Sequence, residues 1–151
     1  MTTTARQDVR AGLYALLVAF QAANPTLLFS VFRSRPGAPG VELPGAFVGN
    51  LNEPSIIHTS GTRQRNFAPE IVVFDSFAPS NEEQAARLDI VIDALLDYLT
   101  ANPGAIAHSI LALNQASITD GEFDIAGGQV TTHYRAVAIG LGQITIMEGR
   151  N

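Results

Sequence analysis

Two segments of the chain repeat apolar residues at three- and four-residue spacing, which is the pattern of an amphipathic helix. The first predicted helix covers residues 5–23, with Thr4 and Gln7 as a capping box at its start and Asn24-Pro25 as its stop. The second follows the capping-box residues Ser80 and Glu83 and ends before Pro103. We expect both apolar stripes to be buried, with the core residues Leu13, Leu17, Phe20, Leu88, Leu95 and Leu99.

Other segments alternate apolar and polar residues, which predicts strands. In residues 26–34 this alternation places Leu27, Phe29, Val31, Arg33 and Arg35 on one side. Further strands are predicted over residues 55–60, 63–75, 108–118, 129–141 and 143–147. Pro69 interrupts the longest of these, so we expect an edge position or a bulge there.

Proline and glycine are concentrated in residues 36–54, which predicts a long, projecting loop with a short strand near residues 46–48. The backbone of this loop is expected to lack ladder partners and to be mobile in the free subunit. Residues 119–128 are expected to form turns. The order helix, strands, helix, strands predicts one α+β domain over residues 1–151, a mainly antiparallel sheet with two principal helices packed on one side.

The composition narrows the classes of function. The formal net charge is −5, which argues against broad binding to nucleic acid or to anionic membranes. Cysteine is absent, so packing alone must hold the fold. No apolar run is long enough to cross a bilayer, and Arg6, Asp8 and Arg10 interrupt the first apolar segment. We expect a soluble, unprocessed protein.

Signals of catalysis are weak. The three histidines His58, His108 and His133 lack the spacing of metal ligands. The alternating acids Asp120, Glu122 and Asp124 resemble a calcium loop only superficially, and a solvated hairpin tip is the favoured interpretation. No nucleotide-binding or nucleophile motif is present. We therefore expect no enzymatic activity, no metal and no cofactor.

The charges that stand out belong to the second helix and to two arginine doublets. Asp89, Asp93 and Asp97 fall on one stripe away from the leucine face, beside an outward-facing Ile90. The doublets are Arg33 with Arg35, and Arg63 with Arg65. One hypothesis is that the arginines, chiefly the second doublet, reach the acidic stripe of an adjacent subunit. The alternative is that they pair within their own sheet, with Glu70 or Asp75, while the stripe faces water or a channel.

Four segments together resemble the tail terminator, or tail-completion, proteins of long-tailed bacteriophages. They are "RQDVRAGLYALLVAFQ", "APEIVVFDSF", "NEEQAARLDIVIDALLDYL" and "THYRAVAIGLG". The resemblance covers nearly the whole chain as an order of elements, without a diagnostic motif. It implies a structural virion protein that forms a hexameric ring, caps the tail tube and joins it to the head-proximal connector.

The resemblance also implies partners and a location. These are further copies of the chain, the tail tube protein and the head-tail connector protein, at the head-proximal end of a tail assembled in the host cytoplasm. DNA would pass through the ring without sequence-specific binding, and no membrane would be involved. A head-to-tail adaptor or stopper, a tail-tube subunit, and a small ligand-binding or enzymatic α+β domain remain as alternatives.

Overall fold

The computed structural model describes residues 4–77, 82–102 and 117–149. These residues form two helices and eight strands. In chain order the elements are α1 (Ala5–Ala23), β1 (Ser30–Phe32), β2 (Gly45–Val48), β3 (Ser55–Thr59), β4 (Thr62–Phe67), β5 (Glu70–Ser76), α2 (Glu82–Ala101), β6 (Ser117–Gly127), β7 (Val130–Gly140) and β8 (Ile144–Gly149).

Helix α1 has the predicted bounds and the predicted capping box. The Gln7 backbone N–H donates to the Thr4 hydroxyl, and the Thr4 N–H donates to the Gln7 side-chain oxygen. The helix ends where Asn24 N–H bonds to the Phe20 carbonyl at 2.9 Å, directly before Pro25. Its apolar stripe is buried as predicted, at Val9, Leu13, Leu16, Leu17 and Phe20.

Helix α2 confirms the second predicted stripe. Its inward face buries Leu88, Val91, Ile92, Leu95 and Leu99. The predicted cap residue Ser80 lies outside the described residues, as does most of the strand predicted over 108–118.

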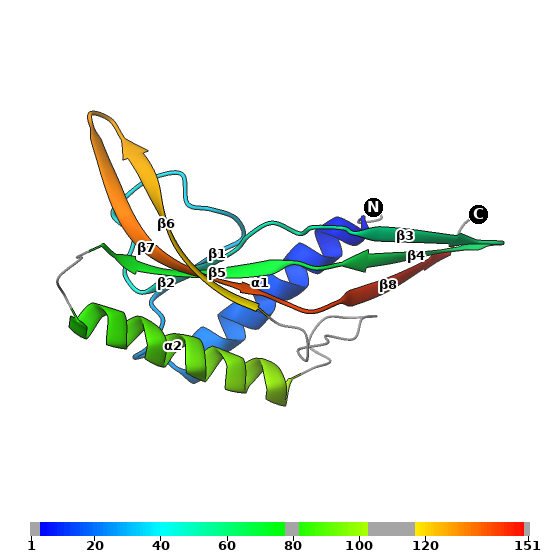
Figure 1. Ribbon diagram of the computed structural model, residues 1–151, viewed down its shortest axis with the longest axis horizontal. Coiled ribbons are helices and arrows are strands. Elements are labelled where there is room, and N and C mark those ends of the chain that lie inside the picture. The colour runs from blue at the N-terminus through cyan, green and yellow to red at the C-terminus, as the bar shows by residue number, and fades with distance from the viewer. Residues whose placement is uncertain (1–3, 78–81, 103–116, 150–151) are drawn as a thin grey trace.

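The strands form two sheets. The larger has the order β1-β2-β5-β7-β6, in which only β1 and β2 are parallel, and the smaller has the order β3-β4-β8 and is antiparallel throughout. Both helices pack on the same face of the larger sheet, where residues such as Leu17, Leu95, Val73 and Ile139 share one core. The predicted α+β fold with two helices on one side of a mainly antiparallel sheet is therefore confirmed (Figure 1).

The opposite face of the larger sheet carries a second, aromatic cluster. Phe74 lies at its centre, with ring centroids 5.3–5.8 Å from those of Phe47, Phe123 and Tyr134. Gly45 is required beside this ring, because an added Cβ would lie 2.6 Å from Phe74 Cζ. The segment between β1 and β2 covers this cluster with Val41 and Leu43.

The predicted projecting loop over residues 36–54 is therefore partly wrong. Its short strand exists as β2, but β2 lies inside the sheet between β1 and β5, and all its residues are buried. The backbone beyond β2 is also paired, because Gly49 N–H bonds to the Glu70 carbonyl at 2.8 Å and Ala68 N–H bonds to the Asn52 carbonyl at 2.7 Å. The premise that this backbone lacks partners fails for residues 45–52.

Two predicted strand boundaries also change. The strand predicted over residues 26–34 is limited to Ser30–Phe32, so Arg33 and Arg35 lie beyond its end. Residues 119–127, predicted as turns, belong to β6, and the turn to β7 is formed by Gly128 and Gln129. Pairing with the strongly β-forming strand 130–140 keeps these polar residues extended, although their composition favours turns.

The smaller sheet extends away from the rest of the molecule, as Figure 1 shows at the right of the view. We call β3, β4 and β8 the arm, and the larger sheet with α1 and α2 the body. Pro69 lies where the chain passes from β4 in the arm to β5 in the body, and its carbonyl accepts a 2.8 Å bond from Leu141 N–H. Pro69 is thus neither on an edge strand nor in a bulge. It separates two consecutive strands that belong to different sheets.

Candidate assembly surface

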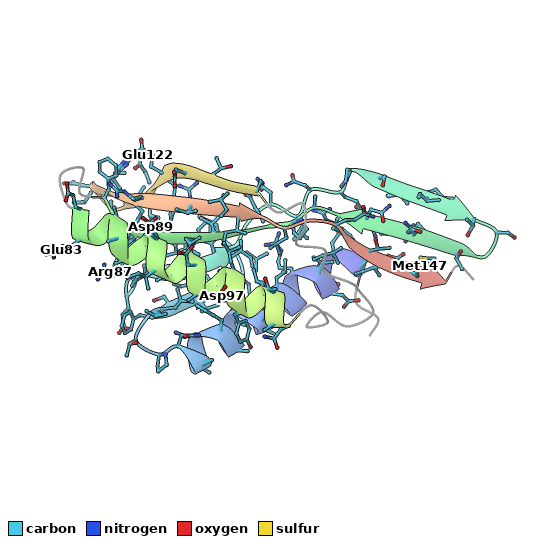
Figure 2. The ribbon with its side chains drawn as sticks, turned by 60° about the horizontal axis from the view of Figure 1, so that its bottom comes forward. Glu83, Arg87, Asp89, Asp97, Glu122 and Met147 are labelled. Carbon is cyan, nitrogen blue, oxygen red and sulfur yellow. The ribbon has the colours of Figure 1, made fainter. Side chains whose placement is uncertain are left out.

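The acidic stripe of α2 faces outward as predicted. Asp89, Asp93 and Asp97 are all exposed, and Ile90 between them is 57% exposed. Figure 2 shows Asp89 and Asp97 along the same helix. Three like charges at four-residue spacing destabilise an isolated helix slightly, by about 0.2–0.5 kcal/mol per pair. The stripe is therefore tolerated by the fold without contributing to its stability.

Strand β6 adds to this negative surface. Asp120, Glu122 and Asp124 lie along the strand and not at the hairpin tip, which corrects the prediction for them. One groove of about 460 Å³ between α2 and β6 is lined by Asp89, Asp120 and Glu122, by Arg135 across from Glu122, and by Leu88 and Val137. We call Asp89, Asp93 and Asp97 with Asp120 and Glu122 the acidic face.

Arginines and carboxylates are concentrated in different parts of the chain and therefore in different parts of the structure. Residues 1–70 contain six arginines and four carboxylates, whereas residues 71–147 contain two arginines and nine carboxylates. The first group builds α1, most of the arm and the segment over the aromatic cluster, and the second builds α2 and the β6–β7 hairpin. The acidic surface of α2 and β6 is thus formed by a different part of the chain from the one that carries most of the arginines.

Arg63 and Arg65 contact carboxylates of their own chain. Arg65 hydrogen-bonds to both oxygens of Glu53 at 2.5 and 2.7 Å, and Arg63 Nε donates to Glu148 at 3.0 Å. Arg65 also reaches Glu148, and Arg6 of α1 joins at 3.5 Å from Glu53. This charge ladder connects helix α1 with the arm.

The ladder shifts the ionisation of its carboxyl groups. The hydrogen bonds from Arg65 hold the pKa of Glu53 below its usual value, although burial opposes the shift. The hydrogen bonds from Arg63 act in the same direction on the pKa of Glu148. Both carboxylates therefore remain charged at neutral pH.

The residues proposed as partners of Arg63 and Arg65 within the sheet, Glu70 and Asp75, lie elsewhere. Asp75 is fully buried and accepts two hydrogen bonds from Arg87 of α2, at 2.6 and 2.8 Å. Those bonds raise the pKa of Arg87. Glu70 accepts from the Asn50 backbone N–H at 3.3 Å. The arginines thus pair within their own chain, but with Glu53 of the loop before β3 and Glu148 of β8.

Sequence reasoning missed the Asp75–Arg87 pair. An aspartate at the end of the run "EIVVFD" is a signal that could have found it, because an acid in a buried strand requires a partner. Helix α2 supplies that partner by turning Arg87 toward β5, so the pair fixes the helix to the sheet.

The doublet Arg33 and Arg35 does not project to one surface. The Arg33 guanidinium lies 4.8 Å from the Tyr14 ring centroid on α1, whereas Arg35 lies 4.9 Å from the Phe123 ring centroid on β6. Arg35 also donates to the backbone carbonyl of Asp124. Both side chains therefore pack against their own molecule at different places.

His133 contacts two of the β6 acids. Its ring bonds to Asp124, and Glu122 lies 3.2 Å from its second nitrogen. Asp124 first, and then Glu122, raise the pKa of His133 above 6.5. His58 lies on β3 at the other end of the molecule, and His108 is outside the described residues.

A second cavity, of about 440 Å³, opens on the face of the sheet opposite the helices. Val72, Ala136 and Ala138 line it, and Arg10 and Arg35 lie at its rim. Arg10 donates to the carbonyls of Arg33 and Val48 at 2.9 and 3.3 Å, so its guanidinium already serves the fold. Within the described ranges, no three His, Cys, Asp or Glu side chains are arranged to hold a metal ion.

The chain matches no known protein family and no curated protein sequence. Within the part of the chain that the structure describes, no helix is long and apolar enough to cross a membrane.

Proposed function

We propose that this chain is a structural subunit of a long-tailed bacteriophage, a tail terminator that assembles as a ring on the head-proximal end of the tail tube. The observation that carries the proposal is the pairing of an acidic face on the body with a separate arm that leaves apolar side chains exposed. A ring needs such a heterologous arrangement, because each copy must offer its neighbour two different surfaces.

The apolar residues are distributed as an interface requires. Ile56, Ile57 and Met147 on the arm are 44%, 47% and 56% exposed, and Ile90 and Ile118 on the body are 57% and 52% exposed. Exposed ion pairs contribute only about 0–1 kcal/mol each, so these apolar contacts supply most of the affinity. The charges on the two surfaces select the partner and its orientation.

The acidic face contacts a neighbouring copy of the chain within the ring. In the terminator role, copies of the chain contact the tube protein below and the connector protein above. DNA passes through the ring without being gripped, since a net charge of −5 disfavours a tight hold on phosphates. Glu53 and Glu148 neutralise part of the positive charge of Arg63 and Arg65. Only the remaining positive charge attracts the acidic stripe of the neighbouring copy.

The role is tested by a phage that lacks this protein. It should produce filled heads and tails that fail to join, or tails of uncontrolled length, as seen by electron microscopy. Restoring the gene in trans is the control and should restore complete virions. Normal virions without the protein would exclude the role, and tails that are absent altogether would favour a tube subunit over a terminator.

Charge reversal on the acidic face tests assembly itself. Asp93→Arg with Asp97→Arg leaves the ladder of the arm intact, whereas reversal at Arg63 and Arg65 also breaks contacts to Glu148 and Glu53. The acid reversal should weaken assembly in sedimentation, more at low salt than at high salt. Glu42→Arg, an exposed reversal on the other face of the sheet, is the control. If the natural protein, the Asp93→Arg, Asp97→Arg variant and the Glu42→Arg variant assemble equally, the acidic face is not part of the interface.

A further inference from the structure

The cavity of about 440 Å³ on the face opposite the helices exists because small side chains line part of that face. Its floor consists of residues that pair across β6 and β7, namely Gly121 with Ala136 and Thr119 with Ala138. Phe47 and Phe123 form one wall, with ring centroids 5.6 Å apart. An apolar floor beside aromatic rings is the lining of a site that receives an apolar group.

Two guanidinium groups lie at the rim of this cavity. One nitrogen of Arg10 donates to the carbonyls of Arg33 and Val48, and one nitrogen of Arg35 donates to the carbonyl of Asp124. A guanidinium has five N–H donors, so both groups keep donors that these contacts do not use. Among the described residues, neither group forms an ion pair with a carboxylate, unlike the arginines of the charge ladder.

The carboxylates near the cavity do not cancel the positive charge of its rim. Glu70 lines the cavity from β5. Asp120 and Glu122 belong to its margin at β6, but by strand alternation their side chains share the other face with Val137, which pairs with Asp120 and packs in the core beside the helices. The charged side chains on the face of the cavity are therefore two guanidiniums and one carboxylate, an excess of one positive charge.

Helix α2 carries the complementary groups on its exposed side. Ile90, Asp93 and Asp97 follow at i, i+3 and i+7, so one apolar side chain and two carboxylates lie in one row. Ile90 is 57% exposed. Both aspartates are exposed, and neither forms an ion pair within the part of the chain that the structure describes. This row matches an apolar cavity that has guanidinium groups at its rim.

We infer that Ile90 of one copy inserts into this cavity in a second copy of the chain. Asp93 and Asp97 then lie beside the guanidiniums at the rim. The inference rests on the proposed ring and names the surface that receives α2 of the neighbouring copy. Helix α2 and the cavity lie on opposite sides of the larger sheet, so each copy binds the next front to back. A heterologous contact of this kind closes into a ring or continues as a filament.

The cavity lies beside the base of the arm. Asn50 and Glu70 line it, and the chain enters the arm at β3 after Asn50 and passes from β4 into the body just before Glu70. A copy whose α2 occupies the cavity therefore also lies close to the arm of the copy that receives it. Burial of Ile90 supplies most of the affinity, since exposed ion pairs contribute little, and the two aspartates set the orientation.

Filling the cavity tests the contact. A side chain at Gly121 should enter the cavity, because an added Cβ would meet no heavy atom within 4 Å and the residue lines the floor. Gly121→Leu should raise the concentration needed for assembly in sedimentation roughly tenfold or more, because it excludes the apolar anchor. Ala126→Leu, on the other face of the same strand, is the matched control and should assemble like the natural protein. Urea unfolding checks that both variants fold.

Cross-linking identifies the occupant, because the natural chain contains no cysteine. Full-length Ala86→Cys protein, which keeps Ile90 and carries its cysteine one turn before it, is mixed with Thr119→Cys protein and treated with bismaleimidoethane. Ile118→Cys lies one residue away on the other face of β6 and replaces Thr119→Cys as the control. The expected result is a covalent dimer at least tenfold above that of the control mixture, and none from either protein alone.

Each contrary outcome is distinct. Assembly of Gly121→Leu at the same concentration as the natural protein would overturn the inference. Assembly of the Ala86→Cys and Thr119→Cys mixture without the dimer would also overturn it and leave the proposed ring standing. A natural protein that stays monomeric at every concentration and gives no dimer would overturn it as well. The dimer together with normal virions from the knockout would instead remove the proposed function and leave the contact.

Discussion

The body and the arm are built from the same kind of strands but are stabilised differently. In the body, two helices cover one face of the sheet and an aromatic cluster with its covering segment fills the other. In the arm, Phe67, Ile144 and Ile146 at the base join the core beside α1, whereas every residue of β3 is exposed. A small sheet without a covered face is marginally stable in water. The sheet of the body is therefore covered on both faces within one chain, whereas β3 of the arm is not.

The largest expected effect is on the free energy of unfolding, when a side chain is removed from the core of the body. Leu95→Ala removes a fully buried side chain from the helix–sheet core and should lower the free energy of unfolding by about 2–5 kcal/mol, measured by urea unfolding of dilute protein. Ile90→Ala on the same helix is the control, because Ile90 is 57% exposed and its truncation should change stability by less than about 0.5 kcal/mol. A near-neutral Leu95→Ala variant would contradict the placement of α2.

The next effect concerns the pair that fixes α2 to the sheet. Arg87→Ala leaves the buried Asp75 carboxylate without its guanidinium partner. Because the Arg87 side chain is 47% exposed, water replaces part of the interaction, and we expect a loss of about 1–3 kcal/mol. Arg87→Lys keeps the charge but not the two-pronged geometry and should lose less. If Arg87→Ala unfolds at the same urea concentration as the natural protein, α2 does not depend on this pair.

A smaller effect should appear at acid pH in the ladder at the base of the arm. In the folded protein the pKa values of Glu53 and Glu148 lie below the ordinary glutamate value of 4.5, because Arg65 and Arg63 donate hydrogen bonds to them. Depressed pKa values mean that the ladder stabilises the arm fully above pH 4.5 and that this contribution is lost as the pH falls through the folded pKa values.

Hydrogen exchange of the arm at pH 6 and pH 3.5, corrected for intrinsic rates, measures this loss. Protection should fall at the lower pH in the natural protein. In the Glu53→Gln, Glu148→Gln variant protection should already be low at pH 6 and change less with pH. An identical pH dependence in both proteins would show that the ladder does not hold the arm.

The smallest effect is local to the β6–β7 hairpin. His133 should titrate with a midpoint above 6.5 by NMR, because Asp124 and Glu122 favour its protonated form. In Asp124→Asn the midpoint should fall, whereas a substitution of the distant Glu42 should leave it unchanged. A His133 midpoint at or below 6.5 in the natural protein would contradict the contact with Asp124.

The sequence predicted the body better than the arm for a physical reason. Helical periodicity and capping report local interactions, so the bounds of α1 and the buried faces of both helices followed from them. Strand pairing joins distant residues, so the sequence showed neither that Pro69 separates two sheets nor that Glu148 would lie beside Arg63. Composition also misled at residues 119–127, where pairing with β7 outweighs the turn preference of Asp and Gly.

The sequence predicted only part of the proposed assembly surface. Outward placement of Asp89, Asp93, Asp97 and Ile90 follows from the helical period alone. The pairing of Arg63 and Arg65 does not follow from the helical period, because their partners come from the loop before β3 and from the last strand. The contribution of Asp120 and Glu122 required the position of β6 beside α2, which depends on the order of strands in the sheet.

The central claim is that the body is complete within one chain and that the arm is completed by a second copy. Hydrogen exchange measured across the concentration range in which the protein assembles tests it most directly. The account predicts that amides of β3, residues 55–59, exchange faster in dilute monomer than in the assembly, while amides of α1, β5 and β7 are slow throughout. Equally slow exchange of residues 55–59 in the monomer and in the assembly would contradict it.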